Sequence, residues 1–202
     1  SNVNFQPIDD SLISFGMNAI KNVGEKALEF IITAREKDGP FNSLFDFTGR
    51  VDLQAVNKKV LESLIVSGSM DHLEGSRAEK VSTIDIALRY GQNIQSERYK
   101  NQVDLFGDSG NGSGVSMVPD LQEVRPWSDG EALANEKGVL GLYLTGHPLL
   151  EYADDLEDFS NHDFTESIQD RNLKIVRIGG AIQNYKIHFD RKNKQMAFFT
   201  LE

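Results

Sequence analysis

The chain has 202 residues, of which 39% are apolar and 26% are charged, a composition that is ordinary for globular domains. No apolar run approaches the roughly 20 residues that span a bilayer, and the opening residues SNVNFQPIDD lack the pattern of a secretory signal, so no membrane association is expected. The absence of cysteine excludes disulfides and thiolate metal sites, and the four histidines are scattered without ligand spacing, so we expect a cytoplasmic protein without metal or other cofactor.

The charge is unevenly distributed along the chain. The net charge of −10 divides into −2 over residues 1–100, −13 over residues 101–170 and +5 over residues 171–202. An acidic protein would ordinarily be a poor partner for nucleic acid, but here the acidity belongs to the middle third. Both flanks are therefore able to meet phosphate.

Residues 11–100 are predicted to be helical. A short helix is expected over 13–20, followed by a longer one that Gly39 and Pro40 end. The apolar face of the longer helix is formed by Ala27, Phe30, Ile31 and Ala34. Further helix starts are predicted at cap residues, which are Ser43, Asn57 and Ser76, the last with Glu79 in a capping box.

Residues 101–127 are glycine-rich and are predicted to be a linker. Ser128 and Glu131 form another capping box, and the helix that they open should end near Gly146 and Pro148. A short acidic helix is expected in LLEYADDLEDF. From about residue 173 the pattern alternates by two, which indicates two strands joined by the basic turn RKNK.

The stretch AIKNVGEKALEFI has the features of a phosphate-binding hairpin. One helix ends at Ile20, and a second begins after a turn through Lys21, Asn22, Val23 and Gly24. Asn and Gly tolerate positive φ, and the start of the second helix leaves unpaired N–H groups that favour an anion. Lys21 and Lys26 flank the turn, which resembles the hairpin of a helix-hairpin-helix DNA-binding motif, although Asn22 stands where that family usually has glycine. The alternative is an ordinary corner between two core helices.

A second turn repeats this arrangement less closely. The chain passes through Glu74 and Gly75 into a helix that begins at Ser76 and Arg77. Arg77 suits phosphate and Glu74 does not, so the alternative of a purely structural hairpin stays open for this unit. Gly75, Ser76 and Arg77 are nevertheless predicted as DNA contacts.

The order of several blocks goes beyond a generic motif. FGMNAIKNVGEKALEFIITARE, GPFNSLFDFTGRVD, VNKKVLESLIVSGSMD, QVDLFG, EKGVLGLYLTGHPL and VRIGGAI occur in sequence. Together they resemble the C-terminal part of the bacterial replicative DNA polymerase III alpha subunit. The resemblance implies a mainly α chain without catalysis of its own, because the family's catalytic aspartates lie upstream. It implies four parts, which are a tandem helix-hairpin-helix domain (1–100), the linker (101–127), a helical connector (128–170) and the start of an OB-fold (171–202).

The same resemblance gives QVDLF, residues 102–106, a role. It is similar to the pentapeptide by which bacterial polymerases bind the sliding clamp, or beta subunit. Leu105 and Phe106 would enter an apolar pocket while Gln102 hydrogen-bonds at its rim, and Asp104 would also belong to the clamp-binding residues. The alternative is that Leu105 and Phe106 fold back onto the helical domain.

The expected partners are thus duplex DNA, the sliding clamp and other replisome subunits. Arg191, Lys192 and Lys194 in the strand-connecting turn are a candidate contact for single-stranded template. Two other classes stay open, namely a helix-hairpin-helix DNA-repair protein and a protein-interaction adaptor that does not bind DNA.

Overall fold

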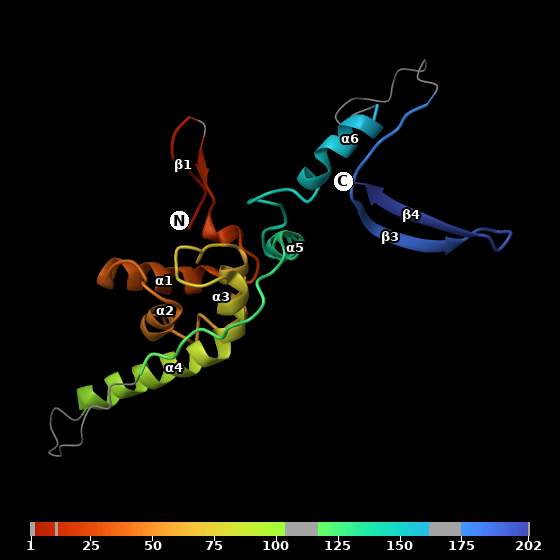
Figure 1. The fold of residues 1–202 in the computed structure, drawn as a ribbon. Helices are drawn as coiled ribbons and strands as arrows, with labels where there is room; N and C mark the ends of the chain where they lie inside the picture. Colours follow the sequence, from red (N-terminus) through yellow and green to blue (C-terminus); the bar gives the residue numbers. More distant parts are fainter. Residues whose placement is uncertain (1–2, 11, 104–116, 162–174, 202) are drawn as a thin grey trace. The chain divides into compact units, whose positions relative to one another are not determined.

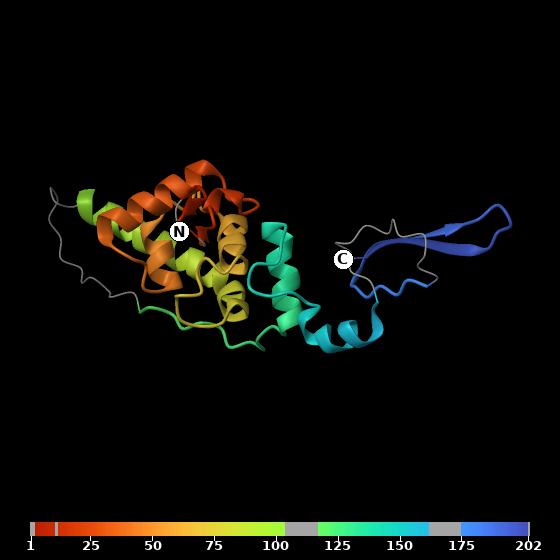
Figure 2. The ribbon, with the colours of Figure 1, turned by 90° about the horizontal axis from the view of Figure 1, so that it is seen from above.

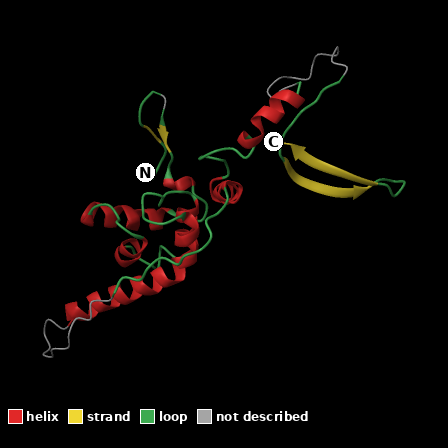
Figure 3. Cartoon of the chain, viewed as in Figure 1, coloured by secondary structure: helices red, strands yellow, loops and turns green. Residues whose placement is uncertain are grey.

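The computed structural model describes residues 3–10, 12–103, 117–161 and 175–201. The chain forms two compact units, Ser1–Leu144 and Thr145–Glu202. Figure 1 gives the order of the elements, and Figure 3 shows that the first unit is built mainly of helices. Within the described ranges, no helix combines the length and the apolar content that crossing a bilayer would require.

A small β-hairpin opens the first unit, where the sequence predicted a helix over 13–20. Strand β1 (Gln6–Pro7) pairs antiparallel with β2 (Ile13–Ser14), and a 3₁₀ turn, η1 (Met17–Ala19), follows. The helical prediction is wrong for residues 13–16 because long-range contacts override local preference. Gly16 lies so close to the opening residues that a Cβ would come within 2.6 Å of the Phe5 nitrogen.

Three short helices form the body of the unit, with starts and ends that follow local sequence rules. Helix α1 (Glu25–Asp38) ends at Gly39, whose φ of 81° needs glycine. The Oγ of Ser43 caps α2 (Leu44–Arg50), and the Oδ1 of Asn57 caps α3 (Lys58–Val66). These caps confirm the sequence prediction.

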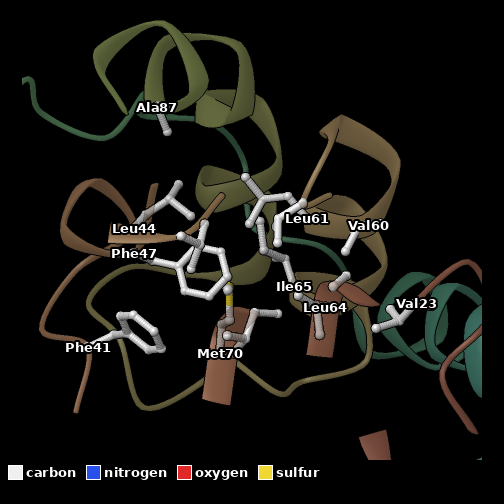
Figure 4. Close-up of a cluster of buried hydrophobic side chains, with 14 of the residues drawn as sticks. Val23, Phe41, Leu44, Phe47, Val60, Leu61, Leu64, Ile65, Met70 and Ala87 are labelled. Atoms are coloured by element: carbon white, nitrogen blue, oxygen red, sulfur yellow. The ribbon is translucent and has the colours of Figure 1, made fainter. Parts of the chain in front are cut away.

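The apolar core lies between these helices (Figure 4). The apolar side chains of α3 are buried, with Leu61 and Ile65 fully inaccessible, and Phe47 of α2 packs edge-to-face on Phe41 at 4.8 Å between ring centroids. On α1 the buried face consists of Ala27, Leu28, Ile31 and Ala34. Phe30, predicted on that face, is half-buried.

Helix α4 (Arg77–Val103) packs against both α2 and α3 (Figure 2). Its contact with α2 is close at Gly91, where an added Cβ would lie 2.7 Å from the carbonyl carbon of Thr48. The helix runs past residue 100, so the first three residues of the predicted linker are helical.

Helix α5 (Asp129–Leu140) also belongs to the first unit and contacts α3. The predicted capping box of Ser128 and Glu131 is present. The helix ends at Leu140, earlier than predicted, because Gly141 adopts the left-handed conformation at φ 78° and closes it.

The second unit contains η3 (Leu150–Tyr152), α6 (Ala153–Phe159) and an antiparallel ribbon of β3 (Ile182–Phe189) and β4 (Gln195–Leu201). A bulge interrupts the register between Gln183 and Lys186, where Asn184 has a φ of 49°. Most side chains of both strands are exposed, including Ile187, Phe198 and Phe199. Two strands with apolar side chains left exposed are consistent with the beginning of an OB-fold.

Candidate nucleic-acid interface

The first hairpin turn, Ile20–Gly24, has the backbone that the sequence predicts. Asn22 takes the left-handed conformation with φ 68°, and its Nδ2 donates to the Oγ of Ser63 at 3.1 Å. Val23 is buried in the core and anchors the turn, while its N–H donates to the carbonyl of Ile20. Gly24 is extended at φ −84°, so only Asn22 uses the positive φ. The turn is therefore held in two ways, by the buried side chain of Val23 in the core and by the hydrogen bond from Asn22 to Ser63 of α3.

The start of α1 is open to an anion. Gly24 is the N-cap residue and has no side chain to satisfy the first amides of the helix. A Cβ placed on Gly24 would meet nothing within 4 Å, so another backbone can approach closely there. Lys21 and Lys26 are exposed beside it and form no ion pair with any described residue. These are the features that bind a phosphate group without contacting a base.

The second turn is different because the start of α4 already holds a carboxylate. Oε2 of Glu79 accepts from the N–H of Ser76 at 2.7 Å and from its hydroxyl at 2.8 Å. The backbone hydrogen bond from Ser76 and then the one from its hydroxyl lower the pKa of Glu79 below its ordinary value. Gly75 has φ 86°, and a Cβ on it would collide with the side chain of Leu121. The second hairpin therefore offers an anion less room than the first.

Arg77 is engaged inside the protein. Its Nη2 lies 2.6 Å from Oδ2 of Asp71, and its Nη1 donates to the carbonyl of Val66 at 3.2 Å and to Oε2 of Glu136 at 3.1 Å. The hydrogen bond to Asp71, followed by that to Glu136, raises the pKa of Arg77 against the opposing effect of burial. In this conformation the guanidinium ties parts of the unit together rather than facing solvent, since the side chain is 14% exposed.

Helix α5 contacts both turns, which the sequence reasoning missed. The carbonyl of Val139 accepts from the N–H of Lys21 at 2.9 Å, and one turn earlier Glu136 accepts from Arg77. Glu136 is fully buried, and its Oε1 also accepts from the N–H of Leu144 at 2.6 Å. A signal was present in the sequence, because Glu136 stands two residues before the largely apolar run GVLGLYL. What the sequence did not show was that this run packs against residues more than fifty positions away.

A buried lysine holds the chain just before the second turn. Lys80 is 1% exposed, and its Nζ donates to the carbonyl of Met70 at 3.0 Å. Burial lowers the pKa of Lys80. Because it is buried, Lys80 cannot contact DNA in this conformation.

The remaining predicted site residues lie elsewhere. Gln102 belongs to the last turn of α4, whereas Asp104, Leu105 and Phe106 fall outside the described residues. Arg191, Lys192 and Lys194 are exposed in the β3–β4 turn. Oδ1 of Asp190 shapes that turn by accepting from the N–H groups of Lys192 and Lys194, both at 2.8 Å.

One face of the ribbon carries both charge and aromatic surface. Lys186 lies opposite Phe198 and His188 opposite Met196, and the rings of His188 and Phe198 are 6.2 Å apart. Phe189, the neighbour of His188, falls on the other face because side chains alternate along a strand. In the described part of the chain, no group of three His, Asp or Glu side chains is placed to hold a metal ion.

Comparison with known proteins shows which families this chain is similar to. A helix-hairpin-helix family model matches residues 1–80. DNA polymerase III subunit alpha of Vibrio cholerae is 34% identical over 199 residues, and that of Borreliella burgdorferi is 34% identical over 196 residues. The corresponding Escherichia coli K12 protein is 31% identical over 199 residues. These alignments cover 98%, 96% and 98% of this chain, but the chain spans only 17% of the length of each relative.

Proposed function

We infer that the chain belongs to the DNA polymerase III alpha subunit family and corresponds to a segment of it. From this premise we propose that the first unit binds the backbone of duplex DNA. The open start of α1 at Gly24, flanked by Lys21 and Lys26, is the observation that supports this proposal. Contacts of this kind position a protein on DNA without selecting a sequence. The segment would hold product duplex during replication, while synthesis would belong to other parts of the longer protein.

The second hairpin has a lesser part in this proposal. Ser76 and the main chain at Gly75 would approach the adjacent backbone, and Arg77 would support the turn from inside. The two lysines at the first turn would carry most of the counterion release. Binding should therefore be weak, independent of sequence and strongly dependent on salt.

The test is duplex binding by fluorescence anisotropy over a range of salt concentrations. Replacing Lys21 and Lys26 together by alanine should weaken binding and reduce the slope of log K against log salt by about 0.9 for each phosphate that the protein no longer neutralises. The matched control replaces Lys37 and Lys59, exposed lysines at the last turn of α1 and the first turn of α3. Both double substitutions remove the same charge. Equal effects on duplex binding would therefore show a general electrostatic attraction and contradict a specific phosphate contact at the first turn.

The clamp contact is a second proposal and rests on the sequence QVDLF. Burial of a leucine and a phenylalanine is worth roughly 1.5–3 kcal/mol each before the ordering costs, which implies modest affinity. A Leu105→Ala/Phe106→Ala variant should lose binding to the sliding clamp, while Val103→Ala should retain most of it. If the double variant binds as well as the unchanged chain, the peptide is not the clamp contact.

The face of the β3–β4 ribbon supports a proposed contact with single-stranded DNA. Phe198 offers a stacking surface, and Lys186, Arg191, Lys192 and Lys194 supply positive charge along one ribbon. Replacing Phe198 by alanine should weaken binding to single strands and leave duplex binding unchanged.

A further inference from the structure

We infer that Glu136 is a positioning residue that sets the spacing between the two hairpin turns, and through it the spacing of two backbone contacts on duplex DNA. This inference rests on the proposed duplex binding. It concerns a residue on α5, outside the part of the chain that the helix-hairpin-helix family model matches.

The geometry places one short helix against both turns. Glu136 and Val139 are three residues apart and so share a face of α5. Glu136 contacts Arg77 at the start of α4, and the carbonyl of Val139 contacts the N–H of Lys21 in the first turn. A displacement of α5 would therefore change both contacts together.

The carboxylate of Glu136 is not required to neutralise Arg77. Asp71, six residues before Arg77 in the same hairpin, already binds that guanidinium at Nε and Nη2. What Glu136 adds is a link from the second hairpin to a different helix. Its other oxygen accepts from the N–H of Leu144, so the carboxylate also fixes the chain just after α5.

Burial explains why such a pair acts on geometry rather than on stability. Burying two charges costs desolvation energy that largely offsets their attraction, whereas the hydrogen-bonding geometry of the pair admits few arrangements. Glu136 is fully buried, and the side chain of Arg77 is 14% exposed. The segment before α5 is held as well, because the N–H of Gln122 donates to Oγ1 of Thr83 on α4 at 2.8 Å.

The spacing can be measured without DNA. The chain has no cysteine, so spin labels can be attached at two introduced positions, Glu25→Cys in the first turn of α1 and Glu74→Cys in the second hairpin turn. We expect a narrow distance distribution that Glu136→Ala broadens and Glu136→Gln largely preserves. A second pair, Glu25→Cys with Lys37→Cys, lies within α1 and should not respond to either variant.

Duplex binding supplies the second readout on the same 202-residue chain. Glu136→Ala should weaken duplex binding because the second hairpin would no longer reach its phosphate, and Glu136→Gln should restore most of the affinity. Glu123→Gln removes the same charge from an exposed position and should not weaken binding. A merely structural role would reduce the melting temperature and leave both the distances and the affinity unchanged.

The outcomes separate the inference from the function on which it rests. Unchanged distances and an unchanged duplex affinity in a folded Glu136→Ala variant would overturn the inference. If Glu136→Ala does not fold, its partner decides, because removing Arg77 breaks the same link. An Arg77→Gln variant whose distance distribution is as narrow as that of the unchanged chain would overturn the inference. Broadened distances in a chain that does not bind duplex at all would overturn the proposed function and support the positioning of the turns.

Discussion

At the scale of single residues, Asn22 combines two demands in one side chain. Its backbone is left-handed, and its amide reaches across to Ser63 of α3. Glycine would satisfy the first demand but not the second, and alanine would satisfy neither. Asparagine is therefore well suited to this position of the turn.

This leads to a prediction for two variants of the turn. Asn22→Ala should lower the free energy of unfolding by about 1–2 kcal/mol because the left-handed backbone is strained without glycine or asparagine. Asn22→Gly should cost less, since only the hydrogen bond and some chain entropy are lost. Urea denaturation measures both, and an alanine variant as stable as the glycine variant would contradict the strain.

A second residue-scale prediction concerns acid. The hydrogen bonds from Ser76 lower the pKa of Glu79 from its ordinary value of 4.5, so the folded state binds this proton more weakly than the unfolded chain. The resulting stability is present above pH 4.5 and is lost as the pH falls through the lowered folded value. Glu79→Gln should therefore flatten the decline in melting temperature below pH 4.5. An unchanged decline would show that the carboxylate at the start of α4 does not contribute.

At the scale of elements, the close contact between α4 and α2 depends on Gly91. Gly91→Ala would place a Cβ against the carbonyl of Thr48, which also accepts from Nε2 of Gln95 at 3.0 Å. Overpacking against backbone should destabilise the unit by about 1–3 kcal/mol.

The matched control is Gly138→Ala in α5, where a Cβ meets nothing within 4 Å. Alanine favours a helix interior over glycine, so this variant should be more stable by about 0.5–1 kcal/mol. The melting temperatures of the two variants should thus shift in opposite directions. Shifts in the same direction would contradict the packing at Gly91.

The elements also show what the sequence is able to predict. The caps at Ser43, Asn57, Ser76 and Ser128 are predictable because each involves residues two to four positions apart. The N-terminal β-hairpin is not, because the pairing of Ile13 with Pro7 overrides the helical pattern. The same limit applies to the candidate site. The turn at Lys21–Gly24 is local and follows from the sequence, whereas the partner of Arg77 on α5 lies 59 residues away and does not.

At the scale of the whole molecule, the charge distribution has a structural counterpart. Two exposed lysines, Lys21 and Lys26, lie beside the open start of α1, whereas Asp71 and Glu79 at the second turn are already bound to donors of the same unit. The net charge of −10 does not by itself argue against DNA binding, because residues 1–100, which contain both hairpin turns, carry only −2 of it.

The most direct test of the account is the effect of Gly24→Ser on stability and on duplex binding. Serine is a better N-cap than glycine, so its hydroxyl should bind the first amides of α1 and raise the free energy of unfolding by about 0.3 kcal/mol. The same hydroxyl would occupy the amides that we assign to phosphate, and so we predict weaker duplex binding by a more stable protein with unchanged charge. A Gly24→Ser variant that binds duplex DNA as tightly as the original chain would contradict the central claim.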